Sequence, residues 1–263
     1  MGGATRVTQS PGSLLVTFGG ARRVLSSAVL GGGIGFAHGW LNGTVPADYD
    51  RLDPAADLAE RAAALGCERP LVGMLTAVDV ARCEQRRRGV AQVFATVGVG
   101  HALAAAGTRP RVVPTVGTIN LLVLVDAPLD DAALAGAAQT ATEAKAQALA
   151  AAAIPAANED CHATGTATDA FCIAALPGGG EPFAGPATAV GADIAHAVYG
   201  AVLAGAVADR ADFGPAFAQA APAIAQSAPA IAQSAPAIAQ SAPAIAQAAP
   251  LPLTPIHPRS AER

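Results

Sequence analysis

The feature that most constrains the fold is a buried strand that leads almost directly into a long helix. The run INLLVLVD at 119–126 is a nearly unbroken series of branched apolar residues, which is typical of a strand covered on both faces. The alanine-rich segment 130–154 follows, with Asp130 or Asp131 as its N-cap, and predicts a long helix. A second apolar run ends the segment 161–176, so the order is strand, helix, strand. If the two strands are parallel, the crossover between them is right-handed.

The N-terminal quarter of the chain predicts a hairpin followed by a helix. The apolar runs LLVTF (14–18) and RRVLSSAVL (22–30) flank the tripeptide GGA, which is typical of a hairpin turn. Further on, Asp53 as N-cap, Pro54 as the first helical residue and Gly66 as the stop predict a helix.

The remaining elements complete a mixed sheet. LVGMLTAV (71–78) and AQVFATVGV (91–99) are strand candidates joined by an arginine-rich turn at 82–88, and a last helix is expected at about 188–206. Early hairpins and a late strand-helix-strand crossover together predict an α/β fold, with a mixed, α+β-like sheet and helices packed on it. With 52% hydrophobic residues the chain can bury such a core, so residues 1–213 are expected to form a single domain.

From residue 214 the chain changes character. A heptapeptide of the form APAIAQ followed by serine or alanine recurs, and the prolines stand seven residues apart at Pro222, Pro229, Pro236, Pro243 and Pro250. This period imitates a coiled-coil heptad, but a proline in every repeat removes a helix donor and clashes with the preceding turn. Residues 214–263 are therefore expected to form an Ala/Pro-rich, low-complexity tail that is disordered, with short helical turns between prolines.

Charge and hydropathy argue against several classes of protein. The net charge of −4 argues against a nucleic-acid binder, which needs a basic surface to neutralise phosphates. The apolar stretch SLLVTF is too short for a signal peptide or a membrane span. The weakly polar segment 187–209 carries Asp193 and His196 and is expected to be a buried helix. We therefore expect a cytoplasmic protein that binds neither nucleic acid nor a membrane, with association into an oligomer left open.

Two familiar kinds of site are not indicated by the sequence. The four cysteines have no CxxC spacing, so neither a zinc ribbon nor a disulfide framework is expected, and no metal site is predicted. No G-x-S-x-G elbow occurs, and no serine lies between Ser27 and Ser227, which excludes a serine triad in the compact domain. Catalytic groups, if present, have to be of another kind.

Two segments resemble one another just ahead of their strands. VGTINLLVLV (116–125) and TGTATDAFCIA (164–174) each have Gly-Thr, then polar residues, then an apolar run. The polar side chains at these two strand starts are Thr118, Asn120, Thr166 and Asp169. If the starts converge, these side chains line one pocket. The alternative is a chance resemblance, because glycine and threonine are frequent at strand edges.

The second of these segments alternates threonine with small residues. In an extended strand, Thr164, Thr166 and Thr168 lie on one face and Asp169 lies on the other. The alternative is a plain threonine-rich strand end or a turn, since threonine and aspartate are also common there.

The helical segment TATEAK (140–145) holds two charged side chains, Glu143 and Lys145. They are two residues apart, which is about 200° around a helix, so at most one of them can be central to a site. Lys145 is the only lysine in the chain, which makes it a candidate for a role that requires a compact ammonium group. The alternative for both residues is a solvated helix surface.

Six motifs follow one another along residues 20–206 in an order that is hard to obtain by chance. They are LNGTVPADYDRLDPAADL (41–58), VGMLTAVDVAR (72–82), GTIN (117–120) before LVLVD, TATEAK (140–145), ATGTATDA (163–170) and FAGPATAVGADIAHAV (183–198). Together they resemble the adenosylcobinamide amidohydrolase family of cobamide salvage. The resemblance implies a cytoplasmic enzyme that hydrolyses the amide joining aminopropanol to the corrin ring and releases adenosylcobyric acid. It implies no metal or organic cofactor, because the cobalt corrinoid is the substrate.

The matched motifs also imply a set of site residues. They are Asn42, Thr76, Gly117, Thr118, Asn120, Thr142, Glu143, Lys145, Thr164, Gly165, Thr166 and Asp169. On chemical grounds, Asp169 or Glu143 can be the base that handles water. Lys145 or the backbone amides near Gly117 can stabilise the oxyanion.

Two of the implied residues have further roles in this hypothesis. Asn120 would hold the scissile amide, and a covalent route through Thr166 is an alternative to attack by water. Polar but uncharged side chains around them would suit the amides on the rim of a corrinoid. Two other functions stay open: a non-catalytic corrinoid-binding or carrier protein on the same scaffold, and an amidohydrolase that acts on another amide.

Overall fold

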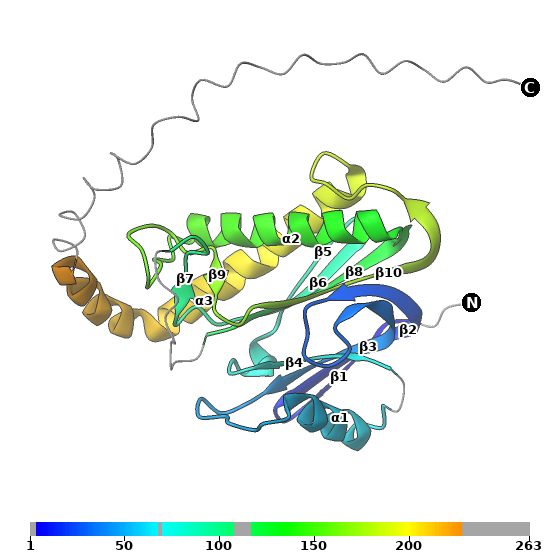
Figure 1. Cartoon of the computed structure of the whole chain (residues 1–263), viewed down its shortest axis with the longest axis horizontal. Coiled ribbons are helices and arrows are strands. Elements are labelled where there is room, and N and C mark those ends of the chain that lie inside the picture. The colour runs from blue at the N-terminus through cyan, green and yellow to red at the C-terminus, as the bar shows by residue number, and fades with distance from the viewer. Residues whose placement is uncertain (1–3, 68–69, 108–116, 228–263) are drawn as a thin grey trace, which may run out of the picture. The chain divides into compact units, whose positions relative to one another are not determined.

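A large mixed sheet forms the centre of the computed structural model, which describes residues 4–67, 70–107 and 117–227, the last 16 of them as backbone only (Figure 1). The strands of this sheet are β1 Arg6–Ser10, β2 Ser13–Ser26, β3 Gly33–Thr44, β4 Val72–Thr76, β5 Glu84–Arg88, β6 Ala91–Val97, β8 Ile119–Leu129 and β10 Ala170–Glu181. A separate two-stranded sheet pairs β7 Ala102–Leu103 with β9 Gly165–Thr166. The helices are α1 Pro54–Ala64, α2 Asp131–Ala151 and α3 Ala189–Ser227, with a short 3-10 turn, η1, at Val80–Arg82.

The strand order places the two ends of the predicted crossover side by side. It runs β4-β3-β2-β10-β8-β6-β5, and β1 pairs with β2 outside this path. Strands β8 and β10 are parallel, as are β3 and β4, whereas the other pairs are antiparallel. Because α2 connects β8 to β10, the predicted strand-helix-strand unit is present. The predicted α/β class with a mixed sheet is therefore confirmed.

Helices α2 and α3 cover one face of the β6, β8 and β10 part of the sheet. Leu121 and Val123 of β8 lie in one buried cluster with Leu134 of α2 and Ile194 of α3. Only alternate residues of β8 point to this face, since successive side chains of a strand point to opposite faces. The other residues of β8 must therefore be covered from the opposite side.

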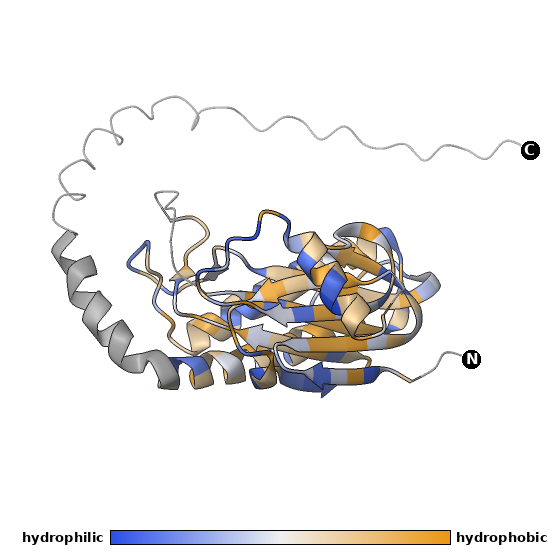
Figure 2. Cartoon of the chain, turned by 90° about the horizontal axis from the view of Figure 1, so that it is seen from below, coloured by the Kyte–Doolittle hydropathy of each residue, from blue (hydrophilic) through white to orange (hydrophobic). Residues whose placement is uncertain are grey.

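The opposite face packs against the part of the sheet formed by β3 and β4. Trp40 of β3 and Met74 of β4 share a buried cluster with Phe94 of β6 and Leu122 of β8. On the outer side of β3, Leu58 of α1 belongs to a third cluster. Figure 1 shows α2 and α3 on one side of these strands and α1 on the other, and Figure 2 shows apolar residues running along the strands between them. This arrangement explains why INLLVLVD is apolar at nearly every position.

The predicted hairpin between 14–18 and 22–30 is wrong. Both runs lie mainly within the single strand β2, and the register against β3 shifts between Thr17 and Arg22, where the sequence GGA lies. Such an irregularity bends a strand without reversing it. The early hairpins are instead β1 with β2 and β2 with β3, and the bent β2 joins the two parts of the sheet.

The predicted arginine-rich turn is also wrong. Glu84–Arg88 forms strand β5, which pairs antiparallel with β6 at the end of the strand order. Charged side chains are common on edge strands, because they discourage pairing with another chain. A short charged run at an edge therefore need not be a turn.

The predicted helix starts are confirmed by their caps. The Asp53 carboxylate accepts the Ala56 N–H at 2.9 Å, and the Asp130 carboxylate accepts the Ala133 N–H at 2.8 Å. These bonds satisfy backbone donors that have no partner within the first turn of a helix. Of the two candidate caps of α2, Asp130 is thus the N-cap.

Helix α3 continues beyond the predicted end at about residue 206. It extends to Ser227 and includes Pro215 and Pro222, with alanine and glutamine, both good helix formers, at many of the positions between them. The chain divides into a unit of Met1–Phe217 and a unit of Ala218–Arg263. The predicted disorder of the tail concerns mainly residues 228–263, which lie outside the described residues.

One segment of α3, Ala189–Ala211, is long and apolar enough to cross a membrane by length and composition. In the structure, Ile194, Val198 and Val202 of this segment are buried in the cluster that covers the sheet. Its apolar residues therefore contribute to the core of the first unit.

Candidate active site

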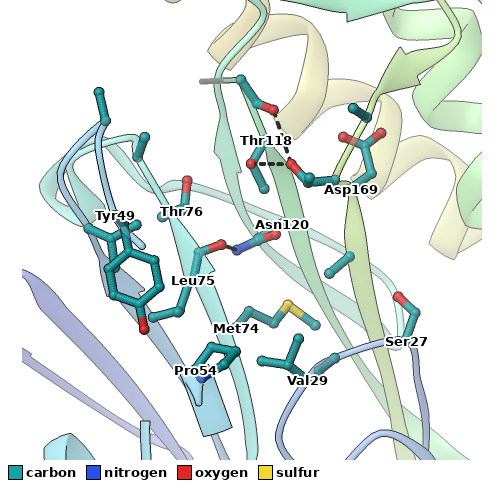
Figure 3. Close-up of a pocket in the computed structure, with 18 of the residues that line it drawn as sticks. Ser27, Val29, Tyr49, Pro54, Met74, Leu75, Thr76, Thr118, Asn120 and Asp169 are labelled. Atoms are coloured by element: carbon teal, nitrogen blue, oxygen red, sulfur yellow. Dashed lines mark hydrogen bonds between the residues drawn. The ribbon is translucent and has the colours of Figure 1, made fainter. Parts of the chain in front are cut away.

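A cavity of about 630 Å³ lies where the starts of β8 and β10 approach the loop after β3 (Figure 3). One side of it is polar, and we call this side the polar floor: Thr76, Thr118, Asn120, Thr168 and Asp169. The other side is mainly apolar, and we call it the apolar wall: Val29, Tyr49, Pro54, Met74 and Leu75. A cavity with a large apolar area and a few convergent polar groups is typical of a small-molecule site.

The polar floor exists because β8 and β10 are parallel neighbours. Asn120 pairs with Ala170 in the register of the two strands, so the residues before them start at the same edge of the sheet. The hydroxyls of Thr118 and Thr168 are 2.7 Å apart, and Thr168 also donates to the Gly117 carbonyl at 3.3 Å. The similarity between the two segments in the sequence therefore corresponds to two adjacent strand starts.

Asp169 is held by four donors. Its Oδ1 accepts the Ile119 N–H at 3.0 Å and the Thr166 hydroxyl, and its Oδ2 accepts the Thr166 N–H at 3.1 Å and the Lys145 ammonium. A carboxylate offers about four lone-pair positions, so all of them are occupied. The side chain is 16% exposed and lines the cavity. Asp169 is thus a half-buried, oriented carboxylate at the polar floor.

Thr166 and Asp169 do not lie on opposite faces of one extended strand, and the alternative of a turn applies instead. The segment is extended only at Gly165–Thr166, turns at Ala167 and Thr168, and becomes extended again at Ala170. The turn brings the carboxylate of Asp169 back to the hydroxyl and the N–H of Thr166.

Lys145 reaches Asp169 from helix α2. Its side chain is 11% exposed, and the ion pair lies between the helix and the sheet. Gly165 leaves room for this pair, because a Cβ at that position would be 2.8 Å from the Lys145 Nζ and still closer to the Asp169 Oδ2. Lys145 and Gly165 are therefore behind Asp169 and do not line the cavity themselves.

Asn120 belongs to a buried chain of amides and hydroxyls. Its Nδ2 donates to the Asn42 Oδ1 at 2.8 Å and to the Leu75 carbonyl at 2.9 Å. Asn42 in turn donates from Nδ2 to the Thr96 hydroxyl at 2.9 Å. Among the described residues, the Asn120 Oδ1 is the buried side-chain polar atom without any hydrogen-bond partner. Asn42 thus supports Asn120 from behind the polar floor.

Three of the predicted site residues lie away from the cavity. Glu143 accepts a hydrogen bond from Gln139 at 2.9 Å on the exposed side of α2, and Thr142 donates to the carbonyl of Ala138 in the same helix. Thr164 accepts the Ala105 N–H at 2.9 Å. None of these three side chains is among those that line the cavity.

The apolar wall contains residues that the motifs alone did not single out. The Tyr49 hydroxyl donates to the Asp57 Oδ2 at 3.1 Å, and Asp57 also pairs with Arg51 and Arg61. The loop that carries Tyr49 is thereby attached to helix α1. Tyr49 and Asp57 both lie within the motif 41–58, so that motif was the available signal in the sequence. The contact between them was not predictable from it.

The environment shifts the ionisation of this pair. Burial alone would raise the pKa of the Asp57 carboxyl, but the hydrogen bonds and charges of Arg61, Tyr49 and Arg51 together leave that pKa below its ordinary value. Burial and the hydrogen bond to Asp57 raise the pKa of Tyr49. Asp57 therefore stays ionised and Tyr49 stays neutral near neutral pH.

Other reactive groups lie outside the cavity lining. Within the described ranges, no three His, Cys, Asp or Glu side chains are grouped so that they could hold a metal ion. Burial raises the pKa of the Cys83 thiol to about 12 and also raises that of Cys172. Both thiols are thus held protonated, and neither lines the cavity. His101 and Ser27 do line it and were not predicted as site residues.

Comparison with known proteins agrees with the motifs. The family described as adenosylcobinamide amidohydrolase matches residues 3–212 of the chain. A Halobacterium salinarum protein named adenosylcobinamide amidohydrolase is 36% identical over 163 residues, which cover 57% of this chain and 65% of that relative. A Methanosarcina mazei protein of the same name is 30% identical over 174 residues, covering 62% of this chain and 80% of the relative. The resemblance drawn from the six motifs is confirmed, and the chain belongs to the adenosylcobinamide amidohydrolase family.

Proposed function

We propose that the protein hydrolyses the amide bond that links aminopropanol to the corrin ring of adenosylcobinamide, giving adenosylcobyric acid for cobamide salvage. The observation that carries this proposal is the oriented Asp169 carboxylate at the floor of a cavity, next to the hydroxyls of Thr118 and Thr168 and the amide of Asn120. Membership of an amidohydrolase family supports the reaction type. Amide hydrolysis requires a proton acceptor, donors for the oxyanion and a proton for the leaving amine.

The reaction proceeds by attack of water on the amide carbonyl carbon. Asp169 accepts a proton from the water as the new C–O bond forms, and a hydroxyl or backbone N–H near Thr118 donates to the developing oxyanion. The nitrogen then takes up the proton held by Asp169 as the C–N bond breaks, and aminopropanol leaves as an amine. The Thr166 hydroxyl can rotate and release one lone pair of Asp169 for the water.

Water is the better nucleophile in this geometry than Thr166. The Thr166 hydroxyl donates to Asp169, so a matched base is available to it. However, Thr166 does not line the cavity, whereas Asp169 does. Glu143 is the weaker candidate for the base for the same reason, since it lies on the exposed side of α2.

The two sides of the cavity suit the two parts of a corrinoid. Amide groups on the rim of the ring can bind the polar, uncharged side chains of Thr76, Thr118 and Asn120. The apolar wall offers Tyr49 and Met74 to the flat ring. In this proposal the cobalt corrinoid is only the substrate, no resident cofactor takes part, and the protein's own side chains carry the acid-base steps.

The proposal includes the setting in which the enzyme works. The acidic net charge of −4 supports a protein that binds neither nucleic acid nor an anionic membrane surface. We propose a cytoplasmic location, and the packing of the apolar residues of α3 on the sheet argues against this helix spanning a membrane. Association of several subunits is compatible with all of these features.

Incubation with adenosylcobinamide, followed by mass spectrometry of the corrinoid and amine products, tests the function. Release of aminopropanol together with adenosylcobyric acid is expected. Retention of intact adenosylcobinamide on the protein without cleavage would instead support a carrier. Absence of both binding and cleavage would point to a hydrolase for another amide. The variant Asp169→Asn is the matched control, because it keeps the size of the side chain and removes the proton acceptor.

A further inference from the structure

The polar floor contains one acceptor that the protein itself leaves without a partner. The Oδ1 of Asn120 is buried and accepts no hydrogen bond within the described structure, and Asn120 as a residue is 0% exposed. Buried acceptors almost always have a partner, because burial without one is unfavourable. This exception lies at a cavity, which indicates that a ligand supplies the missing donor.

The side chain of Asn120 cannot turn to present its NH2 group instead. Both hydrogens of Nδ2 are used, one toward the Leu75 carbonyl at 2.9 Å and one toward the Asn42 Oδ1 at 2.8 Å. A flipped amide would place its oxygen against the Leu75 carbonyl, and two acceptors in contact repel each other. Figure 3 shows the hydrogen bond to Leu75 on one side of Asn120 and the oxygen on the other. Asn120 therefore offers the cavity an acceptor only.

The unpartnered oxygen lies next to the proposed reaction centre. Asn120 pairs with Ala170, the residue after Asp169, and the preceding Ile119 donates its N–H to the Asp169 carboxylate. A ligand amide within reach of Asp169 is thus also close to Asn120. Since the Asn120 Oδ1 can only accept hydrogen bonds, the ligand atom that contacts it has to be a donor. An amide nitrogen that carries a hydrogen meets this requirement, and an ester oxygen does not.

We propose that Asn120 selects the scissile bond by accepting the N–H of the substrate amide at Oδ1. This inference rests on the proposed function and adds to it the rule that decides which acyl compounds are cleaved. Because the oxygen has no hydrogen-bond partner among the described residues, the hydrogen bond to the substrate breaks no hydrogen bond within the protein. The bond also fixes the orientation of the nitrogen, whose lone pair becomes available once water has added to the carbonyl carbon and then takes up the proton held by Asp169 as the C–N bond breaks. Secondary amides are thereby preferred over esters of the same shape.

Two substrates and two proteins test this selection. The substrates are adenosylcobinamide and its ester analogue, in which oxygen replaces the amide N–H. The proteins are the wild type and Asn120→Ala. The ratio of kcat/KM for amide over ester should fall by roughly 10- to 100-fold in the variant, because the ester no longer faces an opposing acceptor and the amide loses its partner. The higher intrinsic reactivity of esters cancels, since it is the same for both proteins.

Thr96→Val is the matched control. Thr96 lies at the far end of the same hydrogen-bonded chain, where its hydroxyl accepts a hydrogen bond from Asn42, and it does not line the cavity. The substitution removes the hydrogen bond that the Thr96 hydroxyl accepts from Asn42. Asn120 keeps its hydrogen bond to the Leu75 carbonyl, which fixes its orientation. The amide-to-ester ratio should therefore stay at the wild-type value. A fall in both variants to the same extent would show that the effect is structural and would overturn the proposal.

A second measurement serves if Asn120→Ala does not fold. Two uncleavable inhibitors with the same tetrahedral centre, a sulfonamide that carries an N–H and a sulfone that carries CH2 in its place, are compared on the wild-type protein. The sulfonamide should bind at least about tenfold more tightly. Equal binding of the two, or an unchanged amide-to-ester ratio in Asn120→Ala, overturns the role of Asn120. Failure of the wild type to cleave adenosylcobinamide at all is a different result and overturns the proposed function itself.

Discussion

Two largely enclosed carboxylates, one on each side of the cavity, are held in similar ways. Asp169 accepts hydrogen bonds from Lys145, Thr166 and the Ile119 N–H, at the polar floor. Asp57 accepts from Arg51, Arg61 and Tyr49, behind the apolar wall. The difference is their access to the cavity, because Asp169 lines it whereas Asp57 contacts it only through Tyr49.

This difference separates two uses of the same local chemistry. An ionised side chain that is oriented by several donors can act on a ligand only if part of it is exposed to that ligand. Asp169 meets this condition, so in the proposed function its donors prepare a group for proton transfer. Asp57 does not meet it, so its donors fix the position of a loop. Substitutions at the two sites should therefore differ in what they change: turnover at Asp169, and stability at Asp57.

The largest effect is expected from Asp169→Asn. Loss of the proton acceptor should reduce kcat for aminopropanol release by about 100- to 10,000-fold, which is the usual contribution of a general base. Circular dichroism and thermal unfolding show whether the variant is folded. Asp131→Asn is the control, because Asp131 is a carboxylate in an exposed ion pair with Arg23 at 2.7 Å and does not line the cavity. Turnover within about tenfold of the wild type in a folded Asp169→Asn protein would contradict a role in proton transfer.

A smaller loss of turnover is expected from Gly165→Ala. The added methyl group would fall 2.8 Å from the Lys145 Nζ and closer still to Asp169, so the pair has to move apart. A displacement of about 1 Å at a catalytic group can reduce kcat/KM about 100-fold, and we expect a reduction of about 10- to 100-fold.

Gly35→Ala on β3 is the matched substitution for this comparison. A Cβ at Gly35 has no heavy atom within 4 Å, so the change tests the loss of a glycine without a steric clash. Similar activity of Gly165→Ala and Gly35→Ala would show that the space at Gly165 is not needed for the ion pair of Lys145 and Asp169.

Asp57→Asn should change the response of stability to acid more than it changes turnover. The pKa of Asp57 is lowered in the folded protein, so its contribution to stability is full above the ordinary value of 3.8 and is lost as the pH falls through the folded value. The variant should have a lower free energy of unfolding at about pH 7 and a shallower decline toward about pH 3. Urea unfolding at several pH values measures both quantities. An unchanged decline would show that Asp57 does not couple the loop to helix α1.

Much of the polar floor was predictable, because it depends on connectivity. A strand, a long helix and a second strand indicate two parallel neighbours, and parallel neighbours start at the same edge of a sheet. Convergence of the segments that contain Asn120 and Asp169 was one of two alternatives, the other being a chance resemblance, and the structure shows convergence. The turn at Ala167 and Thr168 was not predictable in the same way, since threonine and aspartate are compatible with both a strand and a turn.

The contacts that depend on distant strands could not be predicted from local patterns. The unpartnered oxygen of Asn120 results from Leu75 and Asn42, which come from β4 and β3. The link between Tyr49 and Asp57 joins a loop to a helix through side chains. The first contact joins strands that are far apart in the sequence, and the second depends on the rotamers of two side chains. Neither follows from hydrophobic periodicity.

The smallest effect is expected from Glu143→Gln, which completes the comparison of buried and exposed carboxylates. The sequence allowed either Glu143 or Lys145 to be central, because the rotation of α2 relative to the sheet is set by packing. The structure directs Lys145 to Asp169 and leaves Glu143 with Gln139 on the exposed side. Glutamine keeps that hydrogen bond, and surface substitutions change free energies by about 0.5 kcal/mol or less, so turnover should stay within about twofold.

Lys145→Met, in the same helix, should instead reduce turnover and stability strongly, since it leaves the Asp169 carboxylate buried without its cation. Steady-state kinetics of the two variants, measured side by side, decide between them: a large loss in Glu143→Gln with none in Lys145→Met would move the reaction to the exposed side of α2 and away from this cavity.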